Sequence, residues 1–256
     1  MATAPVFLAD PGLLDGYGPG SVYALVGAEA RHAGVVQRRR PGERIDVVDG
    51  AGVRLECVIS VVEPGRLTLD VLGRREEPAP RVRLVLAQAL AKGDRDEMAI
   101  EAATEVGVDE VVPWQADRSV VVWRGERAAK SRARWLATVR EATKQSRRSW
   151  RPEVASPADT AGLAERIAAE VARGGVAVVL HGTGAERLAD VPLPPPDAGA
   201  AVLVVVGPEG GIAARELDVL VGAGARVARL GPTVLRTSTA GPVALALLAE
   251  RLGRWA

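Results

Sequence analysis

The sequence contains very few residues of the types that build disulfides and metal sites. It has one cysteine, Cys57, and two histidines, His32 and His181, among 256 residues. A single cysteine excludes a disulfide framework and any paired-cysteine zinc or redox site within the chain. Two histidines argue against a histidine-rich metal site. We therefore expect a protein that holds no metal.

An excess of charge of one sign and long apolar runs are also missing. The net charge is +1, from 33 basic and 32 acidic residues, so a nucleic-acid partner has to be sought in local clusters of basic residues. No run approaches the roughly 18 apolar residues that suggest a membrane helix, and residues 1–12 lack the features of a signal peptide. These absences predict a soluble, cytoplasmic protein.

The pattern of apolar residues changes near residue 80, which predicts two domains. Residues 1–77 contain short apolar runs separated by turns such as Asp49-Gly50 and Pro64-Gly65, as in a small antiparallel barrel or sandwich. Beyond the charged, proline-interrupted segment 74–80, apolar runs alternate with helical patterns. We predict an α/β fold, with a small β-barrel over residues 1–77 and a mainly parallel sheet flanked by helices over residues 78–256.

Three expected strands in the last third of the chain end in glycine-rich turns, at 178–184, 204–212 and 228–240. Ligands of parallel sheets gather at the carboxyl ends of strands, where glycine lets them approach the backbone. No phosphate-binding P-loop sequence is present, and Gly182-Thr183-Gly184 lacks the last glycine of a dinucleotide fingerprint. Glu209 in the second turn favours a cationic or hydroxyl-rich ligand. Thr237, Ser238 and Thr239 are expected to cap the final helix.

Basic residues cluster between residues 130 and 151. This segment has one acid, Glu141, against eight basic residues: Lys130, Arg132, Arg134, Arg140, Lys144, Arg147, Arg148 and Arg151. Smaller patches lie at 38–40 and 74–75. Such clustering is typical of contacts with a phosphate backbone. On charge alone, RNA binding and an ordinary solvated helix face remain equally open.

Several segments together carry a resemblance to a known family. GPEGG at 207–211 and LGPTVLRTSTA at 230–240 resemble the closing motifs of SPOUT-class ribosomal RNA methyltransferases. The segments 29–52, 89–121 and 141–154 resemble further parts of one such family in the same order. That family, the ribosomal RNA small subunit methyltransferases E, makes 3-methyluridine in 16S rRNA. The resemblance covers nearly the whole chain.

The resemblance implies a fold, a cofactor and partners. It implies a PUA-like barrel that binds RNA, a C-terminal SPOUT domain with a deep trefoil knot, and a homodimer acting on the small ribosomal subunit. The cofactor would be S-adenosylmethionine. By position, the residues expected to bind it are Leu180, His181, Gly182, Gly207, Pro208, Glu209, Gly210, Gly211, Leu230, Gly231, Val234, Leu235, Arg236, Thr239 and Ala240.

Methylation of uracil N3 needs removal of a proton from a weakly nucleophilic nitrogen. An arginine directed at O2 or O4 would stabilise the resulting anion, and we assign this role to Arg236. The proton would pass to water or to a carboxylate such as Glu209. The residues expected to bind RNA are Arg31, Arg38, Arg39, Arg40, Lys92, Arg118, Lys144, Gln145, Arg147 and Arg148.

The chain departs from the family pattern at two places. Ser238 stands where the family often has an acidic residue, which puts an acid–base role at this position in doubt. Lys144-Gln145-Ser146-Arg147-Arg148 replaces a common Glu-Gln-Ser-Gly-Arg, which raises the local positive charge.

Three other readings remain. One is a related SPOUT methyltransferase that acts on another RNA base. Another is a non-catalytic RNA-binding or ribosome-assembly factor. The third, a nicotinamide-dependent oxidoreductase, rests only on the defective glycine fingerprint at 182–187.

Overall fold

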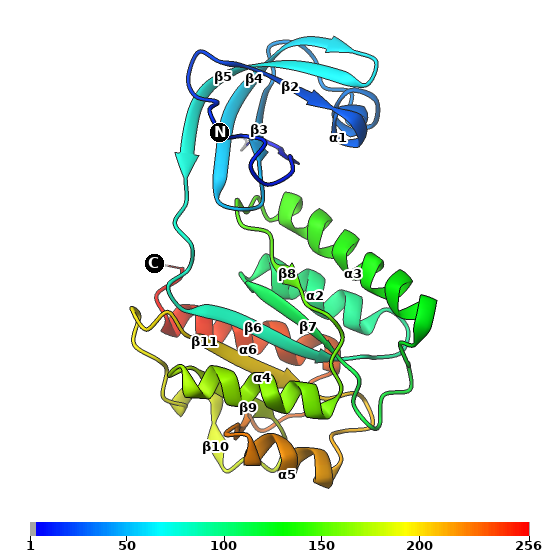
Figure 1. Ribbon diagram of the computed structural model, residues 1–256, viewed down its shortest axis with the longest axis vertical. Coiled ribbons are helices and arrows are strands. Elements are labelled where there is room, and N and C mark those ends of the chain that lie inside the picture. Colours follow the sequence, from blue (N-terminus) through cyan, green and yellow to red (C-terminus); the bar gives the residue numbers. More distant parts are fainter. Residues whose placement is uncertain (1–3, 256) are drawn as a thin grey trace. The chain divides into compact units, whose positions relative to one another are not determined.

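The computed structural model describes residues 4–255, and these form two compact units (Figure 1). The first unit comprises residues up to Ala79 together with Thr143–Arg151, and the second comprises Pro80–Ala142 and Pro152–Ala256. The sequence pattern had grouped residues 143–151 with the second half of the chain. Within residues 4–255, no helix combines the length and the apolar character needed to cross a membrane.

The first unit is built on a mixed five-stranded sheet with the order β1-β3-β4-β5-β2. Its strands are β1 (Val6–Leu8), β2 (Val22–Val26), β3 (Arg44–Val48), β4 (Val53–Glu63) and β5 (Arg66–Glu76). Strand β1 pairs with β3 in parallel, and the other pairs are antiparallel. A short α-helix, α1 (Gly27–Arg31), runs into a π-helix, η1 (His32–Val36).

Alternating side chains and tight turns explain this sheet. On β5, Leu67, Leu69 and Val71 point into a core that also holds Phe7. The predicted turn at 64–65 joins β4 to β5, and Gly65 has a φ of 75°, which glycine adopts without strain. The expected small antiparallel β domain is therefore confirmed in outline, with one parallel edge strand added.

Residues 143–151 join the first unit through specific contacts. The indole Nε1 of Trp150 donates to the carbonyl oxygen of Glu77 at 2.9 Å, and the backbone of Trp150 pairs with Gly50 and Ala51. A Cβ at Gly52 would lie 2.8 Å from the Trp150 ring, so only glycine permits this approach. Trp150 is thus a packing residue of this unit.

The second unit contains a seven-stranded parallel sheet with the order β10-β12-β9-β11-β6-β7-β8. The strands are β6 (Arg83–Ala89), β7 (Glu110–Trp114), β8 (Glu153–Val154), β9 (Val176–Leu180), β10 (Glu186–Arg187), β11 (Ala201–Val206) and β12 (Arg226–Arg229). The helices are α2 (Arg95–Glu105), α3 (Gly125–Gln145), α4 (Thr160–Ala172), α5 (Ala214–Gly222), α6 (Thr237–Arg251) and the 3-10 turn η2 (Leu188–Asp190).

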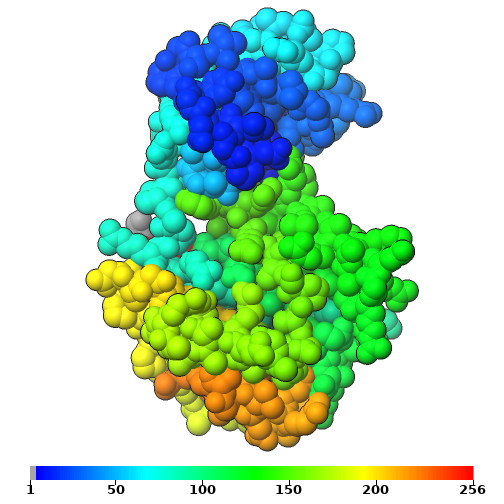
Figure 2. Space-filling view, viewed as in Figure 1, coloured from blue at the N-terminus to red at the C-terminus, as the bar shows by residue number. Residues whose placement is uncertain are grey.

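Both faces of this sheet are buried, as the continuous apolar runs predict. On β11, Val202 and Val204 face a core with α2, α3 and α6, whereas Leu203 and Val205 face a second core with α4 and α5. In Figure 2, α4 in yellow-green and α5 in orange lie side by side at the surface of this unit. The predicted α/β architecture is confirmed.

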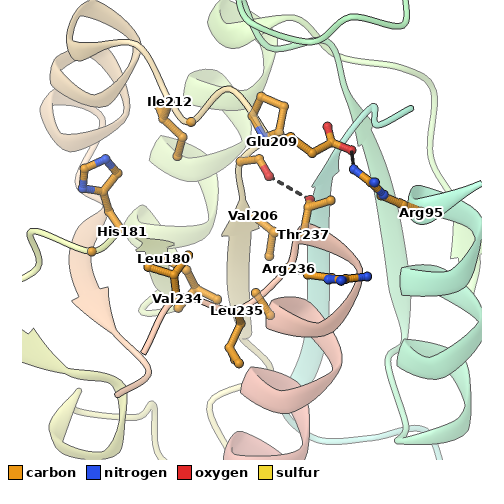
Figure 3. A pocket seen from close by; sticks show the side chains of 15 residues that line it. Arg95, Leu180, His181, Val206, Glu209, Ile212, Val234, Leu235, Arg236 and Thr237 are labelled. Carbon is orange, nitrogen blue, oxygen red and sulfur yellow. Dashed lines mark hydrogen bonds and ion pairs between the residues drawn. The ribbon is translucent and has the colours of Figure 1, made fainter. Parts of the chain in front are cut away.

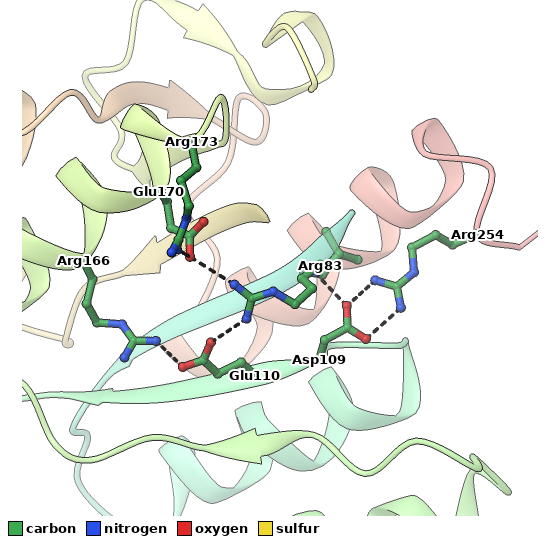
Figure 4. Close-up of polar contacts among 8 residues, drawn as sticks. Arg83, Asp109, Glu110, Arg166, Glu170, Arg173 and Arg254 are labelled. Carbon is green, nitrogen blue, oxygen red and sulfur yellow. Dashed lines mark hydrogen bonds and ion pairs between the residues drawn. The ribbon is translucent and has the colours of Figure 1, made fainter. Parts of the chain in front are cut away.

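Ion pairs join the amino-terminal ends of the central strands to nearby helices (Figure 4). Glu110, the first residue of β7, pairs with Arg83 of β6 and with Arg166 of α4. Glu170 of α4 pairs with Arg83 at 3.1 Å and with Arg173 at 2.6 Å. All strands of this sheet are parallel, so their amino ends share one edge, and the network lies at the edge opposite the glycine-rich turns.

Candidate functional site

The glycine-rich turns after β9, β11 and β12 meet around one cavity. These strands are neighbours in the parallel sheet, so their carboxyl ends reach the same edge. The cavity has a volume of about 540 Å³ and is lined by the three turns, by the start of α6 and by Arg95 of α2 (Figure 3). A second hollow of about 150 Å³ shares part of this lining.

The structure brings together nearly all of the residues expected to bind the cofactor. Lining the main cavity are Leu180, His181, Gly182, Gly207, Pro208, Glu209, Gly211, Val234, Leu235, Arg236 and Ala240. Leu230 and Gly231 line the second hollow. Gly210 and Thr239 line neither. The Gly210 carbonyl instead accepts a hydrogen bond of 3.1 Å from Arg118.

Glycines keep the cavity open in two different ways. A Cβ added at Gly182 or at Gly231 would meet no atom within 4 Å. The absence of a side chain there leaves open space in which a ligand can reach the backbone. At Gly207 an added Cβ would come 2.6 Å from Cγ1 of Ile212, so glycine there allows the turn to close on itself. The side chains of Leu180, Ile212 and Leu235 provide apolar wall.

A buried hydrogen-bond chain holds the start of α6 against the turn after β11. The Gln88 side chain donates to the Thr237 hydroxyl at 2.9 Å, and that hydroxyl donates to the Gly207 carbonyl at 2.8 Å. The helix begins after Arg236, and no side chain caps it. The expectation that residues 237–239 cap α6 is therefore wrong, because Thr237 uses its hydroxyl to join two segments.

Charged groups lie on one side of the cavity. Arg95 and Glu209 form an ion pair of 2.8 Å. Partial burial raises the pKa of Glu209, but hydrogen bonds from its own backbone amide and from Arg95 outweigh burial, and the pKa lies below its ordinary value. Glu209 is thus a weaker base than an ordinary glutamate. The Arg236 side chain is exposed and makes no hydrogen bond or ion pair with residues 4–255.

Arg95 is a site residue that sequence reasoning missed. It follows Gly93-Asp94 in the loop between β6 and α2, and both of those residues adopt positive φ, 66° and 59°. A charged residue at the start of a helix usually faces solvent, so its sequence position gave little signal. The indicator available was its place just beyond the carboxyl end of a predicted buried strand.

The basic residues expected to bind RNA differ in their availability. Exposed in the first unit are Arg31, Arg38, Arg40, Gln145 and Arg147, with Arg148 half-buried; Lys92 and Arg118 are exposed in the second unit. Arg39 is half-buried and pairs with Glu43 at 3.1 Å. Lys144 contradicts the expectation: its side chain is 7% exposed and lies 3.4 Å from the buried Glu29 carboxylate. A lysine held in this way cannot reach a phosphate.

Two further residues of the sequence analysis belong to the core. Trp135, inside the basic segment, is buried against Trp123 with ring centroids 5.3 Å apart. Cys57 is buried in the first unit, and burial raises the pKa of its thiol to about 12. A thiol that stays protonated at neutral pH is a poor nucleophile.

Comparisons with known proteins agree with this geometry. A family model described as an RNA methyltransferase domain matches residues 77–249. Ribosomal RNA small subunit methyltransferase E of Mycobacterium bovis is 45% identical over 236 residues, which cover 92% of this chain and 89% of the relative. The Bacillus subtilis protein of the same name is 30% identical, with 88% of this chain and 89% of the relative covered.

A solved structure extends the similarity to the fold. The ribosomal RNA small subunit methyltransferase E of Neisseria gonorrhoeae, bound to S-adenosyl methionine, is 28% identical with a TM-score of 0.84. The match covers 97% of this chain and 98% of that one. With its cavity at the predicted strand ends and these relatives along nearly its full length, the chain belongs to the RNA methyltransferases, among the ribosomal RNA small subunit methyltransferases E.

Proposed function

We propose that this protein transfers a methyl group from S-adenosylmethionine to N3 of a specific uridine in 16S rRNA of the small ribosomal subunit. The observation that carries the proposal is the cavity formed by the turns after β9, β11 and β12, where nearly all residues assigned to the cofactor meet. The relatives named for small-subunit rRNA methylation support the substrate.

The cavity suits S-adenosylmethionine in size and in chemistry. Apolar side chains and accessible backbone at Gly182 and Gly231 can hold an adenosine, and the carboxylate of Glu209 favours a cationic ligand. When bound, S-adenosylmethionine supplies a methyl group on a positively charged sulfur. The Neisseria structure, solved with this molecule, supports the assignment.

Arg236 is the residue we propose to assist the acceptor base. Its guanidinium lies at the cavity without a partner among the described side chains, on the side occupied by Arg95 and Glu209 (Figure 3). Facing O2 or O4 of uracil, it would stabilise the anion left when the N3 proton leaves. Positioning of the two reactants supplies the remaining acceleration, and the target base leaves its stack to reach the cavity.

Glu209 would contribute through Arg95 rather than as a strong base. Its lowered pKa makes Glu209 a weaker base than an ordinary glutamate, so we assign it to holding Arg95 and not to removing the uracil proton. The ion pair would hold Arg95 in place and offset its charge, which leaves Arg236 as the positive group available to the acceptor base.

The first unit would recognise RNA. We assign the PUA-like barrel to residues 1–77 and the methyltransferase domain to 78–256, with 143–151 contributing to the barrel. Exposed arginines on the first unit, among them Arg31, Arg38 and Arg40, support phosphate contacts.

We also propose the trefoil knot, the homodimer and a cytoplasmic location. Knots are very rare, so the general rule weighs against one. The support is the path of the chain after β12, which lies next to the edge strand β10. From there the chain runs back to the centre of the sheet, where α6 packs against β11 and β6 and Thr237 donates a hydrogen bond to the Gly207 carbonyl. The homodimer rests on the family resemblance, and the location follows from a ribosomal substrate.

Methyl transfer can be tested directly. The purified protein is incubated with tritiated S-adenosylmethionine and small ribosomal subunits lacking 3-methyluridine, and labelled nucleosides are identified by mass spectrometry. Label in 3-methyluridine of 16S rRNA is expected. Label in another nucleoside, or none while S-adenosylmethionine binds, would refute the proposed substrate or the proposed reaction.

A further inference from the structure

A fully buried carboxylate lies behind the turn that follows β11. Glu216 is in the first turn of α5, its residue is 1% exposed, and it does not line the main cavity. We propose that Glu216 is a positioning residue that fixes the segment 207–213, here called the cofactor loop, in the shape that binds S-adenosylmethionine. This inference rests on the proposed function.

Three chain segments donate hydrogen bonds to this one carboxylate. Oε1 accepts from the backbone N–H of Asp117 at 2.8 Å and from the Thr160 hydroxyl at 2.7 Å. Oε2 accepts from the backbone N–H of Ala213 at 3.1 Å. The donors belong to the segment after β7, the start of α4 and the residue before α5. Hydrogen bonds to an ionised acceptor are stronger than neutral ones, so this carboxylate is a firm junction.

The junction reaches the cofactor loop by two routes. The first runs through Ala213, which directly follows Ile212, a wall residue of the cavity. The second runs through Asp117 to the adjacent Arg118, whose guanidinium donates to the Gly210 carbonyl at 3.1 Å. The Glu216 carboxylate therefore holds both ends of the stretch from Gly210 to Ala213, directly at Ala213 and through Asp117 and Arg118 at Gly210.

The arrangement exceeds what a helix cap requires. A cap of α5 would need only the bond between Ala213 and Glu216, which an exposed side chain can also make. Here the other oxygen accepts from two further segments. Thr160 also accepts from the indole N–H of Trp114 at 3.3 Å, so the junction is anchored to a fully buried core residue.

Glu216→Gln tests the inference. An amide offers one oxygen, so its NH2 group must face either the Ala213 N–H or the donors from Asp117 and Thr160. Since hydrogen bonds to a charged group are involved, we expect the Kd for S-adenosylmethionine to rise about ten- to hundredfold by calorimetry. The KM for ribosomal subunits, and kcat at saturating S-adenosylmethionine, should stay within about twofold of the wild type because Arg236 is untouched.

Substitutions at Thr160 probe the same junction by a milder change. Thr160→Val removes one donor and should weaken S-adenosylmethionine binding in the same direction by a smaller factor. Thr160→Ser keeps a hydroxyl and should restore wild-type affinity. These variants keep the test decisive even where Glu216→Gln unfolds.

Glu170→Gln is the matched control for loss of stability. Glu170 is a buried carboxylate of the same unit, 6% exposed, with arginine partners at the opposite edge of the sheet. We expect it to lower Tm without changing the Kd for S-adenosylmethionine. The inference is overturned when Glu216→Gln and Thr160→Val lower Tm but keep wild-type affinity. Failure of the wild type to bind S-adenosylmethionine would instead refute the proposed function, and the inference with it.

Discussion

Arg236 is the side chain on which the proposed chemistry depends most. It is exposed, precedes α6 and makes no side-chain contact that stabilises residues 4–255. Arg236→Ala should therefore change the free energy of unfolding by no more than about 0.5 kcal/mol. Loss of one group that stabilises a developing anion should lower kcat about 10²- to 10³-fold. Urea denaturation measures the free energy of unfolding and the methyl-transfer assay measures kcat, so the two effects are separated.

Arg187→Ala is a suitable control for Arg236→Ala. Arg187 is also exposed, and its partner is Asp190. It should keep wild-type kcat. An Arg236→Ala variant with near-normal turnover would contradict the proposed role.

Glu209 should leave a signature in the pH dependence of stability. Its pKa is lowered in the folded protein, so its ion pair with Arg95 contributes stability above the ordinary pKa of 4.5. That contribution is lost as the pH falls through the lower, folded-state pKa. The Tm difference between wild type and Glu209→Gln should thus shrink as the pH falls below 4.5. A difference that stays constant over this range would show that the ion pair does not stabilise the fold.

Single residues also show where sequence reasoning loses its power. The partner of Lys144, Glu29, lies 115 positions away in the sequence, so charge clustering could not distinguish a buried ion pair from an RNA contact. By contrast, Gly182, Gly207 and Gly231 could be expected at a ligand site, because they follow buried parallel strands whose carboxyl ends meet at one edge of the sheet.

Among the elements, long buried strands and helices are predictable and short ones are not. Strand β11 and helix α3 are long enough for their apolar patterns to be visible in the sequence alone. Strands β8 and β10 have two residues each, too few for any period. Their existence depends on pairing with neighbours far away in sequence.

The hydrogen bonds between the start of α6 and the turn after β11 can be tested by substituting Thr237. Thr237→Val would leave the partly buried Gly207 carbonyl without its donor and remove an acceptor from the buried Gln88. Loss of such buried bonds should cost about 1–3 kcal/mol of the free energy of unfolding, measured by urea denaturation. Thr237→Ser keeps the hydroxyl and should recover most of this loss. Equal stability of the valine and serine variants would show that the hydroxyl does not join these elements.

The glycine turns can be tested for the ligand they are proposed to bind. Gly182 has no positive φ, and an added Cβ meets no atom, so Gly182→Ala should keep wild-type Tm. The methyl group takes up cavity space, and the Kd for S-adenosylmethionine should rise about tenfold or more, since one clash of this kind costs 1–3 kcal/mol. Gly222→Ala, in α5 with equally open surroundings, is the control and should bind normally. Normal binding by Gly182→Ala would place the ligand elsewhere.

At the scale of the whole molecule, the chain divides differently from its sequence pattern. A change in periodicity near residue 80 was visible, because buried parallel strands and half-exposed antiparallel strands differ in apolar pattern. The transfer of 143–151 to the first unit was not visible, since it depends on contacts of Trp150 with Gly50, Gly52 and Glu77. The chain thus crosses between the two units three times, after Ala79, Ala142 and Arg151. Because the units are separate, RNA binding and methyl transfer can be tested separately.

That separation gives a prediction for RNA affinity. Arg38 and Arg40 are exposed on the first unit, whereas the cofactor cavity is built entirely within the second. Arg38→Gln combined with Arg40→Gln should weaken RNA binding and reduce the slope of log K against log salt by about 2, roughly one for each lost phosphate contact. The Kd for S-adenosylmethionine should not change, because neither arginine lines the cavity. Filter binding of 16S rRNA at several salt concentrations measures the slope, with Arg187→Ala as the control. An unchanged slope would mean that phosphate contacts come from other residues than these two arginines.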